Sequence, residues 1–122
     1  MYRIFIETNF AAAHQLHGYK GACSALHGHT WKVRVEIETD QTDEIGISFD
    51  FKALKEITEK AIAPLDHHHI NDVPPFDKEN PTAENLSRYL YHKIKKELPD
   101  FVRITNVTLW ESANYAISYS ED

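Results

Sequence analysis

The sequence is poor in the features that define several large classes of protein. It has one cysteine in 122 residues, so no disulfide can form within the chain. Lys and Arg number 13 against 19 Asp and Glu, a net charge of −6, whereas nucleic-acid binding needs clustered positive charge. No apolar run approaches the roughly 18 residues of a membrane span, and Glu7 interrupts the first apolar stretch too early for a signal peptide. We therefore expect a cytoplasmic protein without nucleic-acid or membrane partners.

What is present fits one small folded domain covering residues 1–122. Hydrophobic residues make up 42% of the chain, enough for one core but not for two, and charged residues make up 26%, an ordinary value for a folded domain. No repeat, low-complexity tract or linker divides the sequence. Histidine is abundant, with eight residues, and its clustering is more informative than its number.

Six segments show the periodicity of regular secondary structure. In the first two, apolar and polar residues alternate with period two, which indicates half-buried strands. In the two middle segments, apolar residues recur at helical spacing after an N-cap residue and before a proline. The predicted elements are strands at 3–14 and 27–39, a helix between Asp50 and Pro64, a helix between Thr82 and Pro99, and strands at 101–110 and 114–119.

This order, ββααββ, predicts an α+β domain with a four-stranded antiparallel sheet and two helices on one face. Two irregular segments remain, near 15–26 and 64–81. Long loops in so small a domain are usually functional or disordered. Because both segments carry His, Asp or Cys, we expect them to be functional.

Three histidines predict a metal site on the apolar face of the first two strands. His27 and His29 lie two residues apart, which in a strand places both side chains on one face, roughly 6–7 Å apart. His14 ends the apolar face of the preceding strand, where antiparallel pairing would bring it beside the other two. Three imidazoles with an open fourth position are typical of catalytic zinc. The alternative, ordinary histidines in a core or on a surface, is open for each residue taken singly.

Cys23 lies four residues before His27, in a polar loop that leads to the predicted metal. A nearby cation favours the thiolate, which can act as a base or a nucleophile. The competing interpretation is a small buried side chain without chemistry.

A second cluster of ionisable residues occupies 65–72, with the sequence LDHHHIND. A carboxylate beside a histidine can orient the imidazole and stabilise its protonated form. Asp66 is followed by His67, His68 and His69, and spacing alone does not say which histidine it serves. A loose metal-binding histidine tract is the alternative.

Glu111 and Thr82 are weaker candidates for substrate binding. A carboxylate at the end of an apolar strand, such as Glu111, could accept paired N–H bonds from a heterocycle. It could equally be a solvated acid at a strand end. Thr82 could line a pocket or simply cap the second helix.

Taken in order, six elements of the chain resemble motifs of the 6-pyruvoyltetrahydropterin synthase / 6-carboxytetrahydropterin synthase family. Their order and number make a chance match very improbable, and they run from near residue 5 to about 119. The elements are 10–16 (FAAAHQL), 23–29 (CSALHGH), Gly46 with Asp50 and Phe51, 65–72 (LDHHHIND), 80–85 (NPTAEN) and Glu111.

The resemblance implies a role for each matching residue. His14, His27 and His29 would hold Zn²⁺. Cys23 would transfer protons, and Asp66 with His67 would form a second acid–base pair, which selects His67 from the three histidines. Glu111 would anchor a pterin ring, and Thr82 would line its pocket. The implied fold is the tunnelling fold, whose subunits form a homohexamer of two trimers with active sites at subunit interfaces.

The implied reaction converts 7,8-dihydroneopterin triphosphate to 6-carboxy-5,6,7,8-tetrahydropterin, releasing acetaldehyde and triphosphate, in the pathway to queuosine and other deazapurines. The shortness of the chain favours this product over 6-pyruvoyltetrahydropterin, which forms when no carbon–carbon bond is cleaved. Cys23 argues against the branch of the family that carries Glu there. A zinc hydrolase on the same fold and a non-catalytic zinc-binding module are the competing hypotheses, because a fold does not fix a function.

Overall fold

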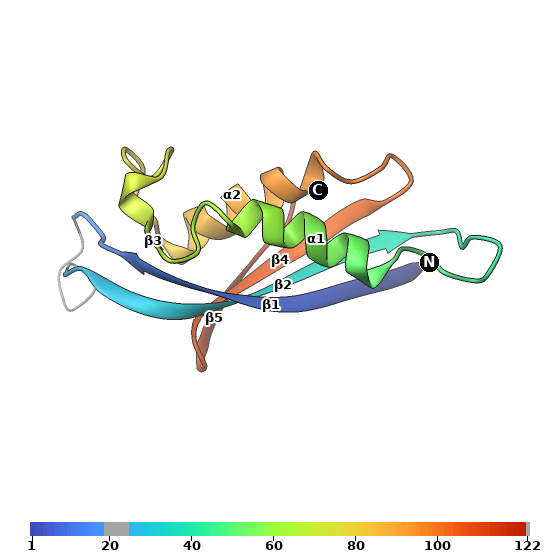
Figure 1. Cartoon of the computed structure of the whole chain (residues 1–122), viewed down its shortest axis with the longest axis horizontal. Helices are drawn as coiled ribbons and strands as arrows, with labels where there is room; N and C mark the ends of the chain where they lie inside the picture. Colours follow the sequence, from blue (N-terminus) through green and yellow to red (C-terminus); the bar gives the residue numbers. More distant parts are fainter. Residues whose placement is uncertain (19–24, 122) are drawn as a thin grey trace.

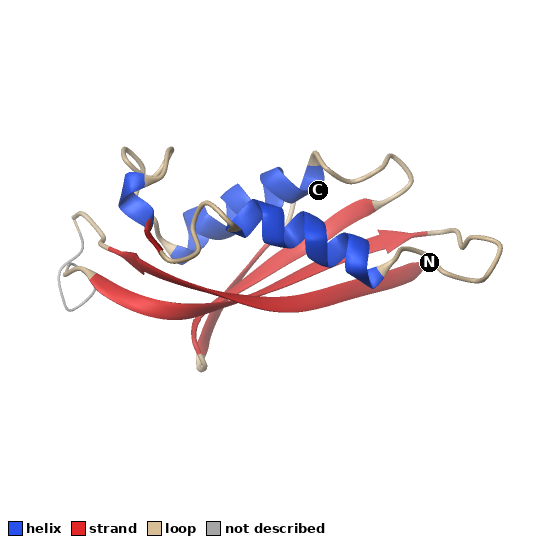
Figure 2. Cartoon of the chain, viewed as in Figure 1, coloured by secondary structure: helices blue, strands red, loops and turns tan. Residues whose placement is uncertain are grey.

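In the computed structural model, which describes residues 1–18 and 25–121, two helices cover one face of a twisted sheet (Figures 1 and 2). The other face of the sheet carries no helix (Figure 1). The elements are β1 (Tyr2–His14), β2 (His27–Thr39), α1 (Phe51–Ile62), β3 (His68–His69), the 3₁₀ turn η2 (Ile70–Asp72), α2 (Ala83–Lys95), β4 (Arg103–Ser112) and β5 (Tyr115–Tyr119).

The α+β class and the two helices on one face are as predicted, but the sheet differs from the prediction. It has five strands in the order β3-β1-β2-β4-β5, and β3 pairs parallel with β1, so the sheet is mixed. The prediction of a four-stranded antiparallel sheet was therefore wrong, because it omitted the short parallel strand β3. The histidine tract runs along the open edge of β1, where Ala12 faces His68 and Ala13 faces His69. A strand of two residues is too short to show a periodic pattern, so the sequence alone does not predict it.

The core lies between the sheet and the helices and follows from the alternation of β1 and β2. Trp31, Val33, Val35 and Ile37 are fully buried on the helix-facing side of β2. The intervening side chains lie on the helix-free face, where charged groups pair across strands, as Lys32 does with Glu7. The helices complete the core with fully buried residues: Leu54 from α1, and Leu86, Leu90 and Ile94 from α2.

Side-chain caps fix where the helices begin. The Asp50 carboxylate accepts from the Lys52 N–H, and the Thr82 hydroxyl accepts from the Asn85 N–H, so each satisfies a free donor of the first turn. The helices end at Ile62 and Lys95, slightly before the prolines expected to stop them. Neither is long and apolar enough to cross a membrane, and the same holds for the whole described part of the chain.

Candidate metal and acid–base site

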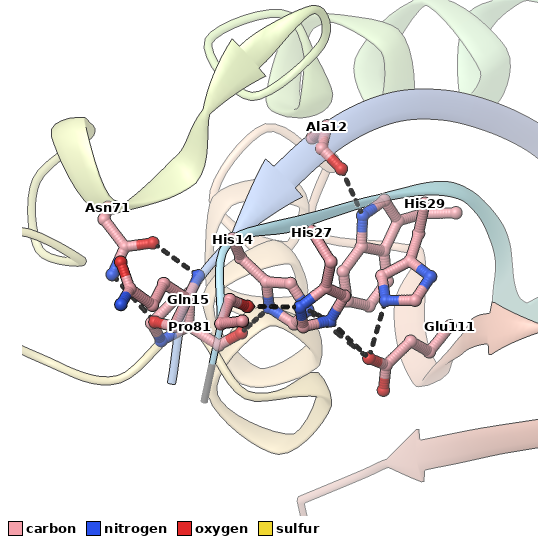
Figure 3. Close-up of polar contacts among 10 residues, drawn as sticks. Ala12, His14, Gln15, His27, His29, Asn71, Pro81 and Glu111 are labelled. Atoms are coloured by element: carbon pink, nitrogen blue, oxygen red, sulfur yellow. Dashed lines mark hydrogen bonds and ion pairs between the residues drawn. The ribbon is translucent and has the colours of Figure 1, made fainter. Parts of the chain in front are cut away.

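Strand register brings the three predicted metal ligands together at one end of the sheet. His14 faces His27 across the β1–β2 pair, and Ala12 faces His29, so all three imidazoles project from the helix-facing side. Figure 3 shows the rings converging beside Glu111. The His14 side chain is fully buried, whereas His27 and His29 are each 24% exposed. The site therefore has a closed base and an accessible side.

Backbone carbonyls fix the protonation of two of these rings. His14 Nδ1 lies 2.8 Å from the Pro81 carbonyl oxygen, and His27 Nδ1 lies 2.7 Å from that of Ala25. A carbonyl only accepts, so each Nδ1 must carry the hydrogen, and each Nε2 then presents a lone pair. Outer partners of this kind commonly orient metal-binding histidines.

The inward nitrogens lie close enough together that they could hold one cation. His14 Nε2 lies 2.9 Å from His27 Nε2, so two lone pairs face each other, which is unfavourable without a cation or proton between them. His29 Nε2 is buried and makes no hydrogen bond within the described residues. Glu111 Oε1 lies 3.3, 3.7 and 3.0 Å from Nε2 of His14, His27 and His29. Tetrahedral zinc ligands bonded at about 2.0–2.1 Å stand about 3.3 Å apart. The four ligand atoms here all lie within 4.8 Å of one another, so they could hold a metal ion such as zinc.

The electrostatics of the cluster favour neutral imidazoles. Burial lowers the pKa of His14, and neighbouring His27 and His29 lower it further, although the Pro81 carbonyl and Glu111 oppose the shift. Burial also lowers the pKa of His29. A metal-binding nitrogen must be unprotonated, so both shifts keep the site available to a cation at neutral pH. Trp31 packs edge-on against both rings and holds them in place.

Asp66 and His67 form a second, more exposed arrangement beside β1. Asp66 Oδ1 accepts from the Ala11 N–H at 3.0 Å and lies 3.0 Å from His67 Nδ1. The His67 N–H donates back to the Ala11 carbonyl at 2.5 Å. The Ala11 hydrogen bond, supported by His67, lowers the pKa of the Asp66 carboxyl, although partial burial opposes the shift. This carboxylate is therefore suited to accept from the His67 ring.

The backbone of His67 adopts a left-handed conformation, with φ of 59°, that is uncommon outside glycine. Such conformations often occur at functional sites, and they persist only where the surrounding structure holds them in place. The two hydrogen bonds to Ala11 supply that restraint. The His67 side chain itself is 82% exposed.

The neighbouring histidines have other partners. His68 Nδ1 donates to the Asp66 backbone carbonyl, and His69 Nδ1 lies 3.5 Å from Asp72 Oδ2. Of the three, only His67 contacts the Asp66 carboxylate. The tract borders an open hollow of about 540 Å³ that also reaches the metal cluster through His29. Its lining residues are Ala11, Ala12, Ala13, Gly28, His29, Thr30, His67, His68 and His69.

Three further residues were predicted to belong to the site. Cys23 lies outside the described residues. The Thr82 hydroxyl oxygen accepts from the Asn85 N–H, so it acts as a helix cap whatever else it does. Glu111 is the extra residue of a β-bulge between β4 and β5, a distortion that often aims a side chain into a site.

Two features of the site were not predicted from the sequence. The Pro81 and Ala25 carbonyls act through the backbone, and no side chain marks a carbonyl for such a role. The approach of Glu111 to the histidines did have a signal. Val107, Leu109 and Glu111 share one face by period two, and Leu109 pairs with Val33, two residues from Trp31 and four from His29.

Comparisons with known proteins cover nearly the whole chain. The profile of the family described as "6-pyruvoyl tetrahydropterin synthase" matches residues 3–122. A 6-carboxy-5,6,7,8-tetrahydropterin synthase from Haemophilus influenzae is 32% identical, with 99% of this chain and 100% of that protein covered. A dihydroneopterin monophosphate aldolase from Pyrococcus furiosus is 30% identical, with 94% of each chain covered. The structure of 6-pyruvoyl tetrahydropterin synthase from Caenorhabditis elegans, 25% identical, superposes with a TM-score of 0.85, covering 100% of this chain and 98% of that one. The chain belongs to the 6-pyruvoyl tetrahydropterin synthase family.

Proposed function

We propose that the protein is a zinc-dependent lyase that converts 7,8-dihydroneopterin triphosphate and water to 6-carboxy-5,6,7,8-tetrahydropterin, with release of acetaldehyde and triphosphate. The observation that carries the proposal is the convergence of three Nε2 atoms and one carboxylate oxygen on a single point, beside a histidine–aspartate pair. Relatives named for this carboxy product support the choice of reaction. The implied pathway is that of queuosine and other deazapurines.

His14, His27 and His29 would hold the zinc. Zinc supplies Lewis-acid chemistry, which makes nearby hydroxyl groups of a substrate more acidic. In the neutral rings, the Pro81 and Ala25 carbonyls hold the hydrogen on Nδ1, so that the inward Nε2 atoms of His14 and His27 carry the lone pairs. Glu111 Oε1 lies 3.0 Å from His29 Nε2, so the placement of this carboxylate would affect both the metal and the substrate bound beside it.

Asp66 and His67 would move protons on the side chain of the substrate. With Nδ1 directed at the Asp66 carboxylate, the His67 ring offers Nε2 as the atom that accepts and returns a proton. A negative neighbour stabilises the imidazolium formed in this step. Cys23 would supply the second proton-transfer group. Two such groups can shift a double bond along a carbon chain, because one can remove a proton from one carbon while the other delivers a proton to the next.

Glu111 would anchor the pterin ring and Thr82 would line its pocket. The Glu111 side chain is 29% exposed, so one edge remains open to a ligand while Oε1 faces the histidines. A carboxylate accepting paired N–H bonds from a heterocycle makes a strong, oriented contact. Thr82 still has its hydroxyl hydrogen to donate while its oxygen caps α2.

The working form would be a homohexamer of two trimers. Both sheet edges invite pairing: β5 at one end, and at the other the long part of β1 that lies beyond its two-residue contact with β3. Unprotected edges of this length are normally covered in the native assembly. Ultracentrifugation of the zinc-loaded protein tests this arrangement, and a monomer would contradict it.

Product analysis tests the function. Zinc-loaded protein incubated with 7,8-dihydroneopterin triphosphate should yield 6-carboxytetrahydropterin and acetaldehyde, identified by mass spectrometry. A pyruvoyl product without acetaldehyde would move the protein to 6-pyruvoyltetrahydropterin synthase. Absence of turnover by assembled, zinc-loaded protein would overturn the catalytic proposal and leave a zinc-binding module.

A second candidate is favoured by the relative from Pyrococcus furiosus, which is named an aldolase acting on dihydroneopterin monophosphate. An aldolase also cleaves a carbon–carbon bond and also begins by removing a proton from a hydroxyl group. The two functions separate on substrate: the same assay run with the monophosphate should show turnover only if this chain shares that activity.

A further inference from the structure

Two asparagine side chains continue the sheet beyond the end of β1. After His14 the chain leaves its strand pairing with β2, and the backbone groups of the next residues need new partners. Asn71 Oδ1 accepts from the Gln15 N–H at 2.9 Å, and Asn71 Nδ2 donates to the Gln15 carbonyl at 2.9 Å (Figure 3). A primary amide thus makes the same two-bond contact that a neighbouring strand would make.

Asn80 repeats this contact two residues further on. Its Oδ1 accepts from the His17 N–H at 2.9 Å, and its Nδ2 donates to the His17 carbonyl at 2.7 Å. Asn85 Nδ2 in turn donates to the Asn80 backbone carbonyl at 2.9 Å and ties this segment to the first turn of α2. Alternate residues of one segment are therefore held by two amides that come from different parts of the chain.

The two asparagines join the metal ligand to the acid–base pair. The edge of β1 is bonded in sequence to Asp66 and His67 at Ala11, then to β3, and then to Asn71 at Gln15. Asn80 immediately precedes Pro81, whose carbonyl sets the orientation of the His14 ring.

We propose that Asn71 and Asn80 are positioning residues that fix the backbone after His14, and thereby set both the aim of this metal ligand and its placement relative to Asp66 and His67. They act through other residues and touch neither metal nor substrate. The metal part of this inference rests on the chain's own geometry, and its catalytic part rests on the proposed function.

The test compares Asn71→Asp and Asn80→Asp with the control Asn9→Asp. Each asparagine-to-aspartate change keeps the size and the acceptor but sets a second carboxylate oxygen against the carbonyl that the amide had bonded. Asn9 is exposed on the helix-free face of β1, and its side chain makes no hydrogen bond with the described residues. Asn71→Leu removes both hydrogen bonds, and Asn71→Asp carries the test if the leucine variant does not fold.

Zinc affinity, measured by chelator competition, should fall by up to about 10-fold in Asn71→Asp and Asn80→Asp, less than the loss of a direct partner of a metal ligand would cause, because both asparagines act through the backbone. The turnover number should fall in the same variants, while KM stays near that of the unsubstituted protein. Amide exchange of Gln15 in Asn71→Leu, measured by NMR without metal, should become faster.

Folded Asn71→Asp and Asn80→Asp variants with unchanged zinc affinity and turnover would overturn the proposal. So would an equal loss in Asn9→Asp, because the effect would then be one of added charge. Zinc affinity and amide exchange are measured without substrate. They judge the positioning role even if the unsubstituted protein fails to turn over the pterin.

Discussion

The two halves of the candidate site are built differently, although both depend on β1. The metal half projects from paired strands, has His14 fully buried, and holds its rings by carbonyls and Trp31. The acid–base half is held to the edge of β1 by two hydrogen bonds with the Ala11 backbone, one from the Asp66 side chain and one from the His67 N–H. The His67 side chain is 82% exposed. A metal site needs fixed ligands before the cation arrives, whereas a proton carrier must reach the substrate. The exposed side chain of His67 leaves its ring accessible from solvent.

Removing a ligand from the metal half should have the largest effect. His14→Ala deletes the most buried nitrogen, and zinc affinity should fall by more than the roughly 100-fold that loss of an outer partner costs. Turnover should fall to background. Metal analysis after dialysis and the product assay measure both. The matched control is His92→Ala on the surface of α2, where the imidazole pairs with Glu121 away from the site. Zinc retained at full occupancy in His14→Ala would contradict the ligand assignment.

Substitution of Cys23, the predicted proton-transfer group, should reduce catalysis without affecting metal binding. Cys23→Ala should keep the fold and about one zinc per chain, yet lose on the order of 10²–10⁴-fold in turnover, the usual contribution of a general acid or base. Steady-state kinetics and zinc analysis on the same preparation make the comparison. Unimpaired turnover would remove the thiol from the mechanism.

Substitutions in the acid–base half should reduce turnover less than substitutions in the metal half. Asp66→Asn keeps the acceptor for the Ala11 N–H but removes the charge beside His67, so turnover should fall about 100-fold with zinc content unchanged. Asp72→Asn is the matched control, because Asp72 also lies beside a histidine, His69, at 3.5 Å. Similar losses in the two variants would deny Asp66 a specific role.

A substitution of Glu111 tests whether this carboxylate binds the substrate or the metal. Glu111→Gln keeps the shape and removes the charge. If the carboxylate anchors the pterin, KM should rise about 10- to 100-fold, the cost of one charged hydrogen bond, while zinc stays bound. A loss of zinc affinity with unchanged KM would instead make Glu111 a metal ligand.

The smallest expected effect concerns pH and stability. The pKa of Asp66 is lowered from 3.8 by the Ala11 N–H, so the folded state favours its carboxylate form. Its stabilising contribution is complete above this ordinary value and is lost as pH falls through the lowered one. The difference in unfolding free energy between metal-free protein and Asp66→Asn should therefore be constant at neutral pH and shrink in acid. Chemical denaturation at several pH values measures it, and a difference that grows in acid would contradict the shift.

The regular elements could be predicted because they carry contrast between two faces. The bounds of β2 match the predicted 27–39, since apolar and charged residues alternate along its whole length. The same period-two reasoning placed His27 and His29 on one face. It could not show β3, whose pairing is set by the tertiary position of His68 and His69 along the edge of β1.

Parts of the site escape sequence reasoning because their chemistry is generic. Asn71 and Asn80 have the composition of ordinary turns, and only the folded chain shows which backbone groups their amides meet. Spacing left the partner of Asp66 open among three histidines. In the structure it is the His67 ring that lies beside this carboxylate, with Nδ1 3.0 Å from Asp66 Oδ1.

Trp31 lies close enough to His14 and His29 for its fluorescence to respond to changes at these two rings. Its indole is fully buried, with ring centroids 4.9 Å from His14 and 5.3 Å from His29. The charge of a neighbouring ring or of a cation bound to it changes indole emission, so fluorescence would report whether the proposed metal binds to these histidines. The second tryptophan, Trp110, lies under Lys32 on the helix-free face, and a Trp110→Phe variant would leave one clean signal.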